Sequence, residues 1–267
     1  MTSGSTQPTL ALRAFDSVDA LADALFKKMK ATDACSYEFG AAFRGMRARA
    51  ASVDLALGAL AQPDLVGHAQ TLVPTAPAAQ VLVDTYVAQV LFGIWSTFEC
   101  MVFGINALGC AVDPTDFHSV ETTASLKKVD PNNVFGGCAG RPARPGYAMH
   151  FPKWNGVFDA NKAVLARLND YHNISKHRRA AAAGGTVHPG FIDKLKPSMG
   201  EGPAMMAAMA RATWIEILLE SKPGVALPER SPSATTGVLL DELVAEYRRV
   251  AREAGEALII DLTALTK

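Results

Sequence analysis

Residues 167–179 hold the densest group of side chains in this chain that could carry out chemistry. The sequence is Arg-Leu-Asn-Asp-Tyr-His-Asn-Ile-Ser-Lys-His-Arg-Arg, with two histidines, two asparagines, one aspartate and four cationic residues. Histidine exchanges protons near neutral pH, whereas arginine, lysine and asparagine donate hydrogen bonds to phosphate oxygens. The residue types therefore indicate acid–base chemistry on a substrate that contains phosphate.

A helix over about residues 155–183 must position this segment, and Gly184-Gly185 is expected to end it. Its apolar side is marked by residues that share one face at helical periodicity: Val157, Val164, Leu165, Leu168 and Tyr171. His172 lies about 40° from Leu168 around the helix axis, so we expect it to lean towards the core.

The polar side of the same helix carries a ladder of side chains. Asn169, Asn173 and His177 follow one another at i, i+4 and i+8, and Asp170 lies beside them. Side chains at this spacing can act on one ligand together. Asn169 and Asp170 would therefore be supporting residues of any site that uses Asn173 and His177.

This segment resembles the HEPN superfamily (higher eukaryotes and prokaryotes nucleotide-binding), whose signature is an arginine followed four to six residues later by a histidine on a helix. Two registers fit. Arg167 and His172 satisfy the spacing, although Leu168 stands where a polar residue is usual. His172-Asn173-Ile-Ser-Lys-His177 matches the commoner Arg-Asn-x3-His form, with histidine in place of arginine. The second register is preferred because Asn173 and His177 share a polar face.

The resemblance implies metal-independent RNA cleavage by a homodimer in which two such helices meet. It implies that His177, or His172 in the other register, transfers the proton and that Asn173 positions the phosphate. Arg167 or Arg178 would stabilise the developing charge, and Lys176 together with Arg178 would bind the substrate. Proteins of this kind occur in toxin–antitoxin and defence systems, so an antitoxin partner is a further expectation.

A non-catalytic interpretation stays open beside it. Cationic residues near a helix C-terminus interact favourably with the helix dipole whatever the protein does. His172 could be an ordinary histidine at the edge of a core, and Asn169 and Asn173 could bind neighbouring loops. The alternative is a helical scaffold or ligand-binding protein in which this cluster is structural.

No cofactor and no metal site are predicted. The glycines form no phosphate loop, and there is no GxSxG nucleophile motif. His172 and His177 are five residues apart, so they face different sides of the helix. His150 and His188 lie in expected loops, which leaves a composite metal site as the remaining option.

Glu99 interrupts an otherwise apolar helix. A buried glutamate needs a partner, because burial of an unpaired charge costs several kcal/mol. Arg167, His172 or His177 could supply it. Glu99 would then either orient a histidine or hold two helices together; the alternative is a glutamate that reaches the surface.

The composition predicts a soluble, cytoplasmic protein. Lys plus Arg equals Asp plus Glu, so net charge favours neither nucleic acid nor membranes, and any basic site must be local. The four cysteines have no paired spacing, which is typical of reduced thiols, and residues 1–14 do not form a signal peptide. Thr85–Val112 is apolar, but Asp84 and Glu99 leave no uncharged run of about 20 residues, so we expect a buried helix and no membrane span.

The fold class predicted is all-α, a multi-helix bundle over residues 15–267 as one domain after a disordered leader over 1–14. Helices are expected from Ser17 or Asp19 to about residue 30, and over 37–60, 80–108, 155–183, 204–220 and 238–262, with Gly109 ending the third. The segment 113–153 is expected to be rich in loops, because Pro and Gly are frequent there. A short β-hairpin is expected over 186–197.

Overall fold

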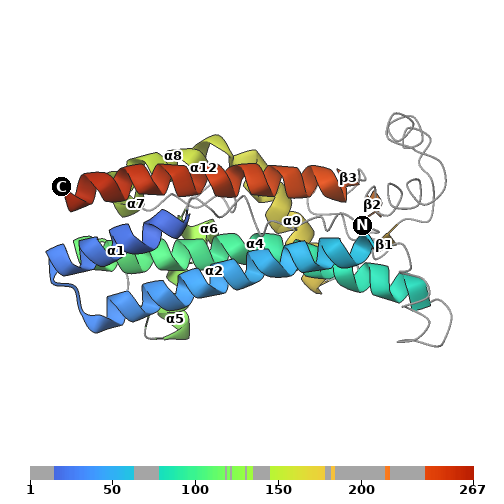
Figure 1. Ribbon diagram of the computed structural model, residues 1–267, viewed down its shortest axis with the longest axis horizontal. Helices are drawn as coiled ribbons and strands as arrows, with labels where there is room; N and C mark the ends of the chain where they lie inside the picture. Colours follow the sequence, from blue (N-terminus) through green and yellow to red (C-terminus); the bar gives the residue numbers. More distant parts are fainter. Residues whose placement is uncertain are drawn as a thin grey trace, which may run out of the picture. The chain divides into compact units, whose positions relative to one another are not determined.

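The structure is a computed structural model, and it describes residues 15–62, 78–117, 119–120, 122–129, 131–134, 145–177, 182–183, 214–216 and 238–267. The protein is all-α, as predicted (Figure 1). Its helices are α1 (Asp16–Met29), α2 (Asp33–Leu60), α4 (Ala78–Val112), α5 (Thr123–Lys128), α6 (Pro131–Val134), α7 (Pro145–His150), α8 (Pro152–Ala160), α9 (Lys162–His177) and α12 (Leu240–Thr266). Three very short strands are β1 (Ala182–Ala183), β2 (Trp214–Glu216) and β3 (Val238–Leu239).

The chain divides into two compact units. Unit 1 comprises Met1–Ala51, Trp95–Ala166 and Glu246–Lys267, and unit 2 comprises Ser52–Ile94 and Arg167–Ala245. Each unit therefore draws on parts of α2, α4, α9 and α12.

Aromatic side chains from different helices build the core of unit 1. Phe98 of α4 contacts Phe158 of α8 and Tyr247 of α12 edge to face, with ring centroids 6.0 and 5.8 Å apart. Trp154 lies 4.6 Å from Phe158, and both rings are fully buried. Such pairs contribute about 0.5–1.5 kcal/mol each beyond the area that they bury. These contacts fix α8 and α12 against α4.

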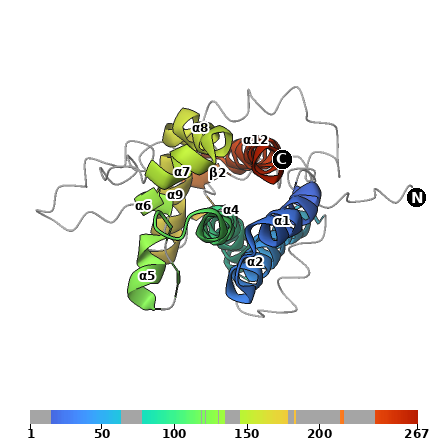
Figure 2. The ribbon, with the colours of Figure 1, turned by 90° about the vertical axis from the view of Figure 1, so that its left-hand side faces the viewer.

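The other side of α4 in unit 1 packs against α1 and α2. Phe43 of α2 occupies the space beside Gly104, where any side chain would collide with its ring. Phe15 meets Phe43 edge to face at 5.8 Å, which joins the start of α1 to the same contact. Figure 2 shows α4 lying between the α1–α2 pair and the α7–α8 pair. The apolar character of α4 on every side follows from this position.

Polar contacts made by α12 fix both ends of α8. The buried Asp261 carboxylate accepts hydrogen bonds from the backbone N–H groups of Lys153 and Trp154, at 3.1 and 2.8 Å. At the other end, Arg249 donates to the Asn161 side-chain oxygen at 2.8 Å. The Asn161 amide in turn donates to the carbonyl of Val157 at 2.8 Å. These contacts explain why α8 ends at Ala160 and α9 begins at Lys162, where one continuous helix was predicted.

Unit 2 also contains buried apolar residues. They come from one half of each long helix: Val53, Ala56 and Leu60 of α2, Leu82, Val87, Val90, Leu91 and Ile94 of α4, Leu168 and Tyr171 of α9, and Leu240, Leu243 and Val244 of α12. The strands form an antiparallel sheet in the order β1-β2-β3, in which Ala183 pairs with Ile215 and Ile215 with Val238.

Several predicted boundaries are wrong, and each has a physical reason. Gly109 does not end α4, which continues to Val112; the missing side chain instead makes room for the Phe117 ring. The helix predicted over 155–183 is described as far as His177, and Ala182–Ala183, which were placed within it, form a strand that pairs with β2. Trp214–Glu216 form a strand where a helix was predicted, because this segment pairs with β1 along one edge and with β3 along the other.

The expected loop-rich segment contains short helices, α5, α6 and α7, and α8 begins within it. The hairpin predicted over 186–197 and the leader over 1–14 lie outside the described residues.

Within α4, Thr85–Val112 is long and apolar enough to cross a membrane by length and composition alone. Of its most apolar stretch, 67% is buried inside the protein. A core helix has these same properties, and the burial agrees with the internal position predicted for this segment.

Candidate functional site on helix α9

Helix α9 carries the predicted site, and unit 2 holds all the predicted site residues on it that the structure describes. Asn161 precedes α9, and its backbone carbonyl accepts a hydrogen bond from Leu165 N–H at 3.0 Å. Helical backbone continues as far as His177, so positions 169, 173 and 177 follow one another at the predicted spacing. The local sequence thus presents a regular helical face.

His172 lies on the inner face of α9, as predicted from the helical pattern. Its exposure is only 3%. Its imidazole ring lies against Phe92 of α4, with ring centroids 5.5 Å apart and ring planes inclined by 33°. A ring buried in this way is poorly placed to exchange a proton with a substrate at the surface.

Arg167 begins the unit 2 part of α9 and is partly buried beside Tyr171. Burial raises the pKa of Tyr171 to about 12, and the positive charge of Arg167 opposes that shift. Tyr171 is therefore a neutral core side chain, and Arg167 lies at the border between the core and the polar face.

Asn173 is exposed on the outer face and is joined to Asn169. The Asn173 side-chain amide donates a hydrogen bond to the Asn169 side-chain oxygen at 3.0 Å. This i, i+4 bond fixes the orientation of both amides along the helix. The structure thus brings together two of the predicted polar residues.

Asp170 is half-buried next to this pair. Burial raises the pKa of its carboxyl group above the ordinary value of 3.8. The shift disfavours the charged form, so the environment does not stabilise a negative charge on this side of α9.

The remaining α9 candidates carry side chains that the structure does not describe. His177 and Lys176 belong to the helix, but their side chains lie outside the described part, as do Arg178 and Arg179 entirely. Glu99 belongs to unit 1 and is of intermediate exposure, so the full burial considered from the sequence is not observed.

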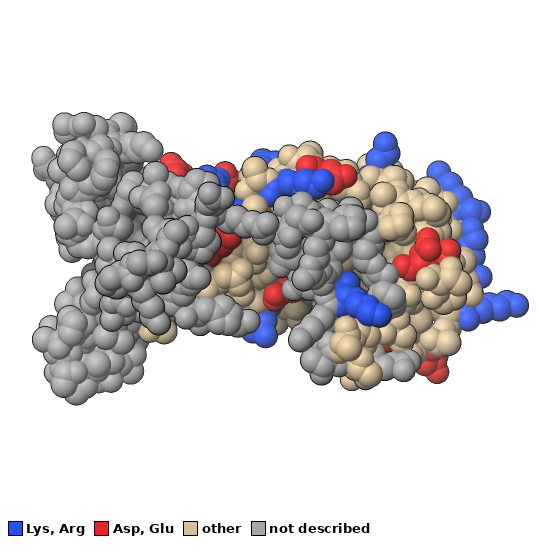
Figure 3. All heavy atoms as spheres, turned by 180° about the vertical axis from the view of Figure 1, so that it is seen from behind, with Lys and Arg blue, Asp and Glu red and all other residues tan. Residues whose placement is uncertain are grey.

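Charge on the described surface is mixed on the face shown in Figure 3, where Lys and Arg are interspersed with Asp and Glu. This agrees with the equal numbers of cationic and acidic residues in the sequence. A phosphate-binding site has to arise from a local group of donors and not from the field of the whole protein.

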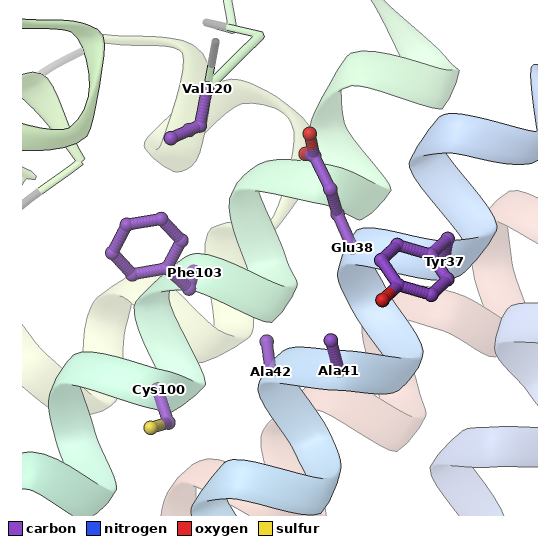
Figure 4. A pocket seen from close by; sticks show the side chains of 7 residues that line it. All are labelled: Tyr37, Glu38, Ala41, Ala42, Cys100, Phe103 and Val120. Carbon is purple, nitrogen blue, oxygen red and sulfur yellow. The ribbon is translucent and has the colours of Figure 1, made fainter. Parts of the chain in front are cut away.

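An apolar pocket of about 250 Å³ lies between α2 and α4 in unit 1. Tyr37, Ala41 and Ala42 line it on α2, with Cys100 and Phe103 on α4 (Figure 4). Burial raises the pKa of the Cys100 thiol, an effect that the charge of Arg49 opposes. A thiol held in its neutral form is a poor nucleophile, so its surroundings do not activate Cys100.

One group of potential metal ligands was missed from the sequence. Asp113, Asp116 and His150 offer three ligand atoms that all lie within 4.8 Å of one another. The sequence predicts a loop position for His150, whereas the structure has it as the last residue of α7. The Asp-x-x-Asp spacing directly after an apolar helix was the signal that could have drawn attention to the pair.

Comparison with known proteins gives no match: no protein-family model, no curated protein and no solved structure is significantly similar to this chain. The class of protein that the structure defines is a helical protein with a polar, asparagine-bearing face on α9.

Proposed function

We propose that this protein binds RNA through the outer face of α9 and cleaves it without a metal ion, in the manner implied by its resemblance to the HEPN superfamily. The observation that carries the proposal is the exposed Asn173 amide, oriented by its hydrogen bond to Asn169 on the face opposite the core. In the preferred register His177 lies one helical turn further along.

RNA cleavage without a metal ion requires a proton-transfer group and hydrogen-bond donors to the phosphate. An amide NH2 group has two hydrogens, so Asn173 can donate one to Asn169 and the other to a phosphate oxygen. His177 is the proposed proton-transfer group for attack by the neighbouring 2′-hydroxyl. Lys176, Arg178 and Arg167 are the proposed cationic partners of the phosphate and of the charge that develops on it.

The proposed active form is a homodimer in which the α9 helices of two copies meet, with an antitoxin as a further partner. Pairing would double the number of cationic and amide donors around one phosphate. It would also supply the second half of a site that one helix face cannot enclose.

The non-catalytic alternative rests on a different observation, the burial of His172 against Phe92. This contact supports a structural role for one of the two histidines. If the same held for the whole cluster, the protein would be a helical scaffold or ligand-binding protein and would not act on RNA.

RNA affinity separates the two interpretations. The probe is a fluorescent single-stranded RNA whose 2′-hydroxyl groups are replaced by fluorine, so that it cannot be cleaved while anisotropy is measured. Loss of a hydrogen bond to a charged phosphate costs about 1.5–3 kcal/mol, so we expect Asn173→Ala to weaken binding by about tenfold or more.

The matched control is Gln62→Ala, which removes an exposed amide two residues after the last residue of α2. Its RNA affinity should equal that of the wild type. Absence of binding by the wild-type protein, or equal affinities for the Asn173 and Gln62 variants, would contradict the proposal and favour the scaffold.

A further inference from the structure

The turn that follows α4 brings two carboxylates to one histidine in unit 1. Asp113 comes directly after the last residue of α4, and Asp116 follows within the same turn. His150 ends α7, a helix that packs closely on this turn: a side chain at Gly146 would come within 3.0 Å of the Asp116 Cβ atom. The three side chains therefore come from two separate segments that are held together.

Hydrogen bonds within the turn fix the first carboxylate. Asp113 Oδ1 accepts from the Thr115 backbone N–H at 3.0 Å and from the Thr115 hydroxyl at 2.6 Å. The Asp116 N–H donates to the Asp113 carbonyl at 3.3 Å. With Oδ1 engaged in this way, the other oxygen, Oδ2, is the one that faces His150.

Apolar rings hold the histidine in place. Phe117 lies 5.8 Å from the His150 ring, and Tyr147 and Phe151 hold Phe117 in turn, at 5.0 and 6.0 Å. His150 Nε2 is shielded from solvent and makes no hydrogen bond to any residue that the structure describes. This nitrogen points to Asp113 Oδ2 and Asp116 Oδ2, at 3.6 and 3.8 Å.

The separations between the His150 nitrogen and the two carboxylate oxygens do not fit direct hydrogen bonds. A charge-assisted N–H···O bond is about 2.7–2.9 Å long, so both distances are too long for one. Two ligands on one tetrahedral metal ion, each bonded at about 2.1 Å, lie about 3.4 Å apart. The solvent-shielded His150 nitrogen stands near that spacing from each carboxylate oxygen, and all three ligand atoms lie within 4.8 Å of one another.

We propose that Asp113, Asp116 and His150 bind a divalent transition-metal ion, Zn²⁺ in the first place. One imidazole nitrogen and two carboxylate oxygens form a donor set that suits zinc, whereas magnesium and calcium prefer oxygen ligands alone. The carboxylate side chains are about one-third exposed, 32% for Asp113 and 36% for Asp116, which leaves the solvent side for a water molecule as fourth ligand.

This inference is independent of the proposed RNA activity. The metal ligands belong to unit 1, whereas Asn169 and Asn173 belong to unit 2. Metal binding is measured without RNA, and RNA cleavage is measured in the presence of a chelator. Failure of either proposal therefore leaves the other standing.

The test is calorimetric titration of the metal-free, full-length protein with Zn²⁺. We expect one ion to bind per chain. Binding of Co²⁺ should give the visible absorption of a tetrahedral site without a thiolate charge-transfer band, because no cysteine takes part. Such a band would assign the bound metal to a thiol and overturn the proposed ligand set, and absence of binding by either ion would overturn the site.

Three variants locate the bound ion. Asp113→Asn retains an oxygen that can accept the Thr115 hydrogen bonds, so the turn is preserved while the anionic ligand is lost. We expect Asp113→Asn and His150→Gln each to weaken Zn²⁺ binding by at least about tenfold. Asp23→Asn, at an exposed position on α1, should leave the affinity unchanged.

Melting curves of the metal-free proteins show which variants fold. If His150→Gln fails to fold, Asp113→Asn decides the question alone. Wild-type affinity in a folded Asp113→Asn protein would contradict the assignment.

Discussion

The imidazole of His172 lies against the phenyl ring of Phe92, with ring centroids 5.5 Å apart. His172 is one of the two histidines of the 167–179 segment, and its side chain is buried among the residues of unit 2. Asn173, the next residue in the sequence, is exposed on the outer face of α9. The two neighbours thus serve different purposes. His172 contributes to packing, and the proposed chemistry belongs to the face that carries Asn169 and Asn173.

Replacing His172 should therefore lower stability and spare activity. His172→Ala leaves a cavity beside Phe92, and a buried side chain of this size contributes about 2 kcal/mol or more to the free energy of unfolding. Urea unfolding measures this loss. RNA cleavage by the folded variant, assayed well below its melting temperature, should stay at the wild-type rate. Loss of cleavage with unchanged stability would instead make His172 the proton-transfer residue.

Asp261→Ala should destabilise the protein by removing the cap of α8. The carboxylate accepts from the N–H groups of Lys153 and Trp154, and no side chain next to α8 in sequence caps that end. Removal of such a cap costs about 0.5–2 kcal/mol, and the buried setting places the expected loss near the upper value. Chemical denaturation measures the free energy of unfolding of both proteins. A decrease well below about 0.5 kcal/mol in the variant would mean that the cap contributes little.

Gly109→Ala should destabilise unit 1 although alanine favours helices. A Cβ atom at this position would overlap the Phe117 ring, which Tyr147 and Phe151 hold in place. Overpacking of this kind costs about 1–3 kcal/mol. Gly156→Ala is the matched control, because open space surrounds that position on α8, and it should gain about 0.5–1 kcal/mol. Equal thermal shifts for the two variants would contradict the packing role of Gly109.

Asp170→Asn should raise the melting temperature at pH 7 and have little effect in acid. Burial raises the folded-state pKa of Asp170 above 3.8, so the folded protein binds this proton more tightly than the unfolded chain does. Below pH 3.8 the Asp170 carboxyl is protonated in both the folded and the unfolded protein, so it has little effect on stability. As the pH rises from 3.8 through the raised folded-state pKa, the unfolded chain loses this proton more readily than the folded protein, and the free energy of unfolding falls. Melting curves at several pH values test this. A variant less stable than wild type at pH 7 would show that the carboxylate makes a stabilising contact.

Helical periodicity was enough to predict the fold class and the buried face of α9. Helix α2 runs over Asp33–Leu60 where a helix over 37–60 was predicted, and His172 is buried as its angle from Leu168 required. These features depend on side chains close together in sequence, so a pattern of apolar and polar residues contains them.

Features that depend on contacts between distant residues could not be predicted in the same way. Asp261 caps a helix whose capped residue, Trp154, lies 107 residues earlier in the chain. The sequence around Trp154 contains no pattern that predicts this partner. A glycine at position 109 predicts a helix end. Its actual role depends on the Phe117 ring, which comes from the turn after α4 and fills the space that a side chain at Gly109 would take. Asp113, Asp116 and His150 meet only because α7 folds back onto that turn.

We propose that the outer face of α9 cleaves RNA with His177 as the proton-transfer residue. The most direct test is incubation of the purified protein with total RNA in EDTA, with His177→Ala alongside and the melting temperature of each protein recorded. We predict cleavage by the wild type, none by the variant, and equal melting temperatures. No cleavage by the wild type, or equal cleavage by both proteins, would contradict this account.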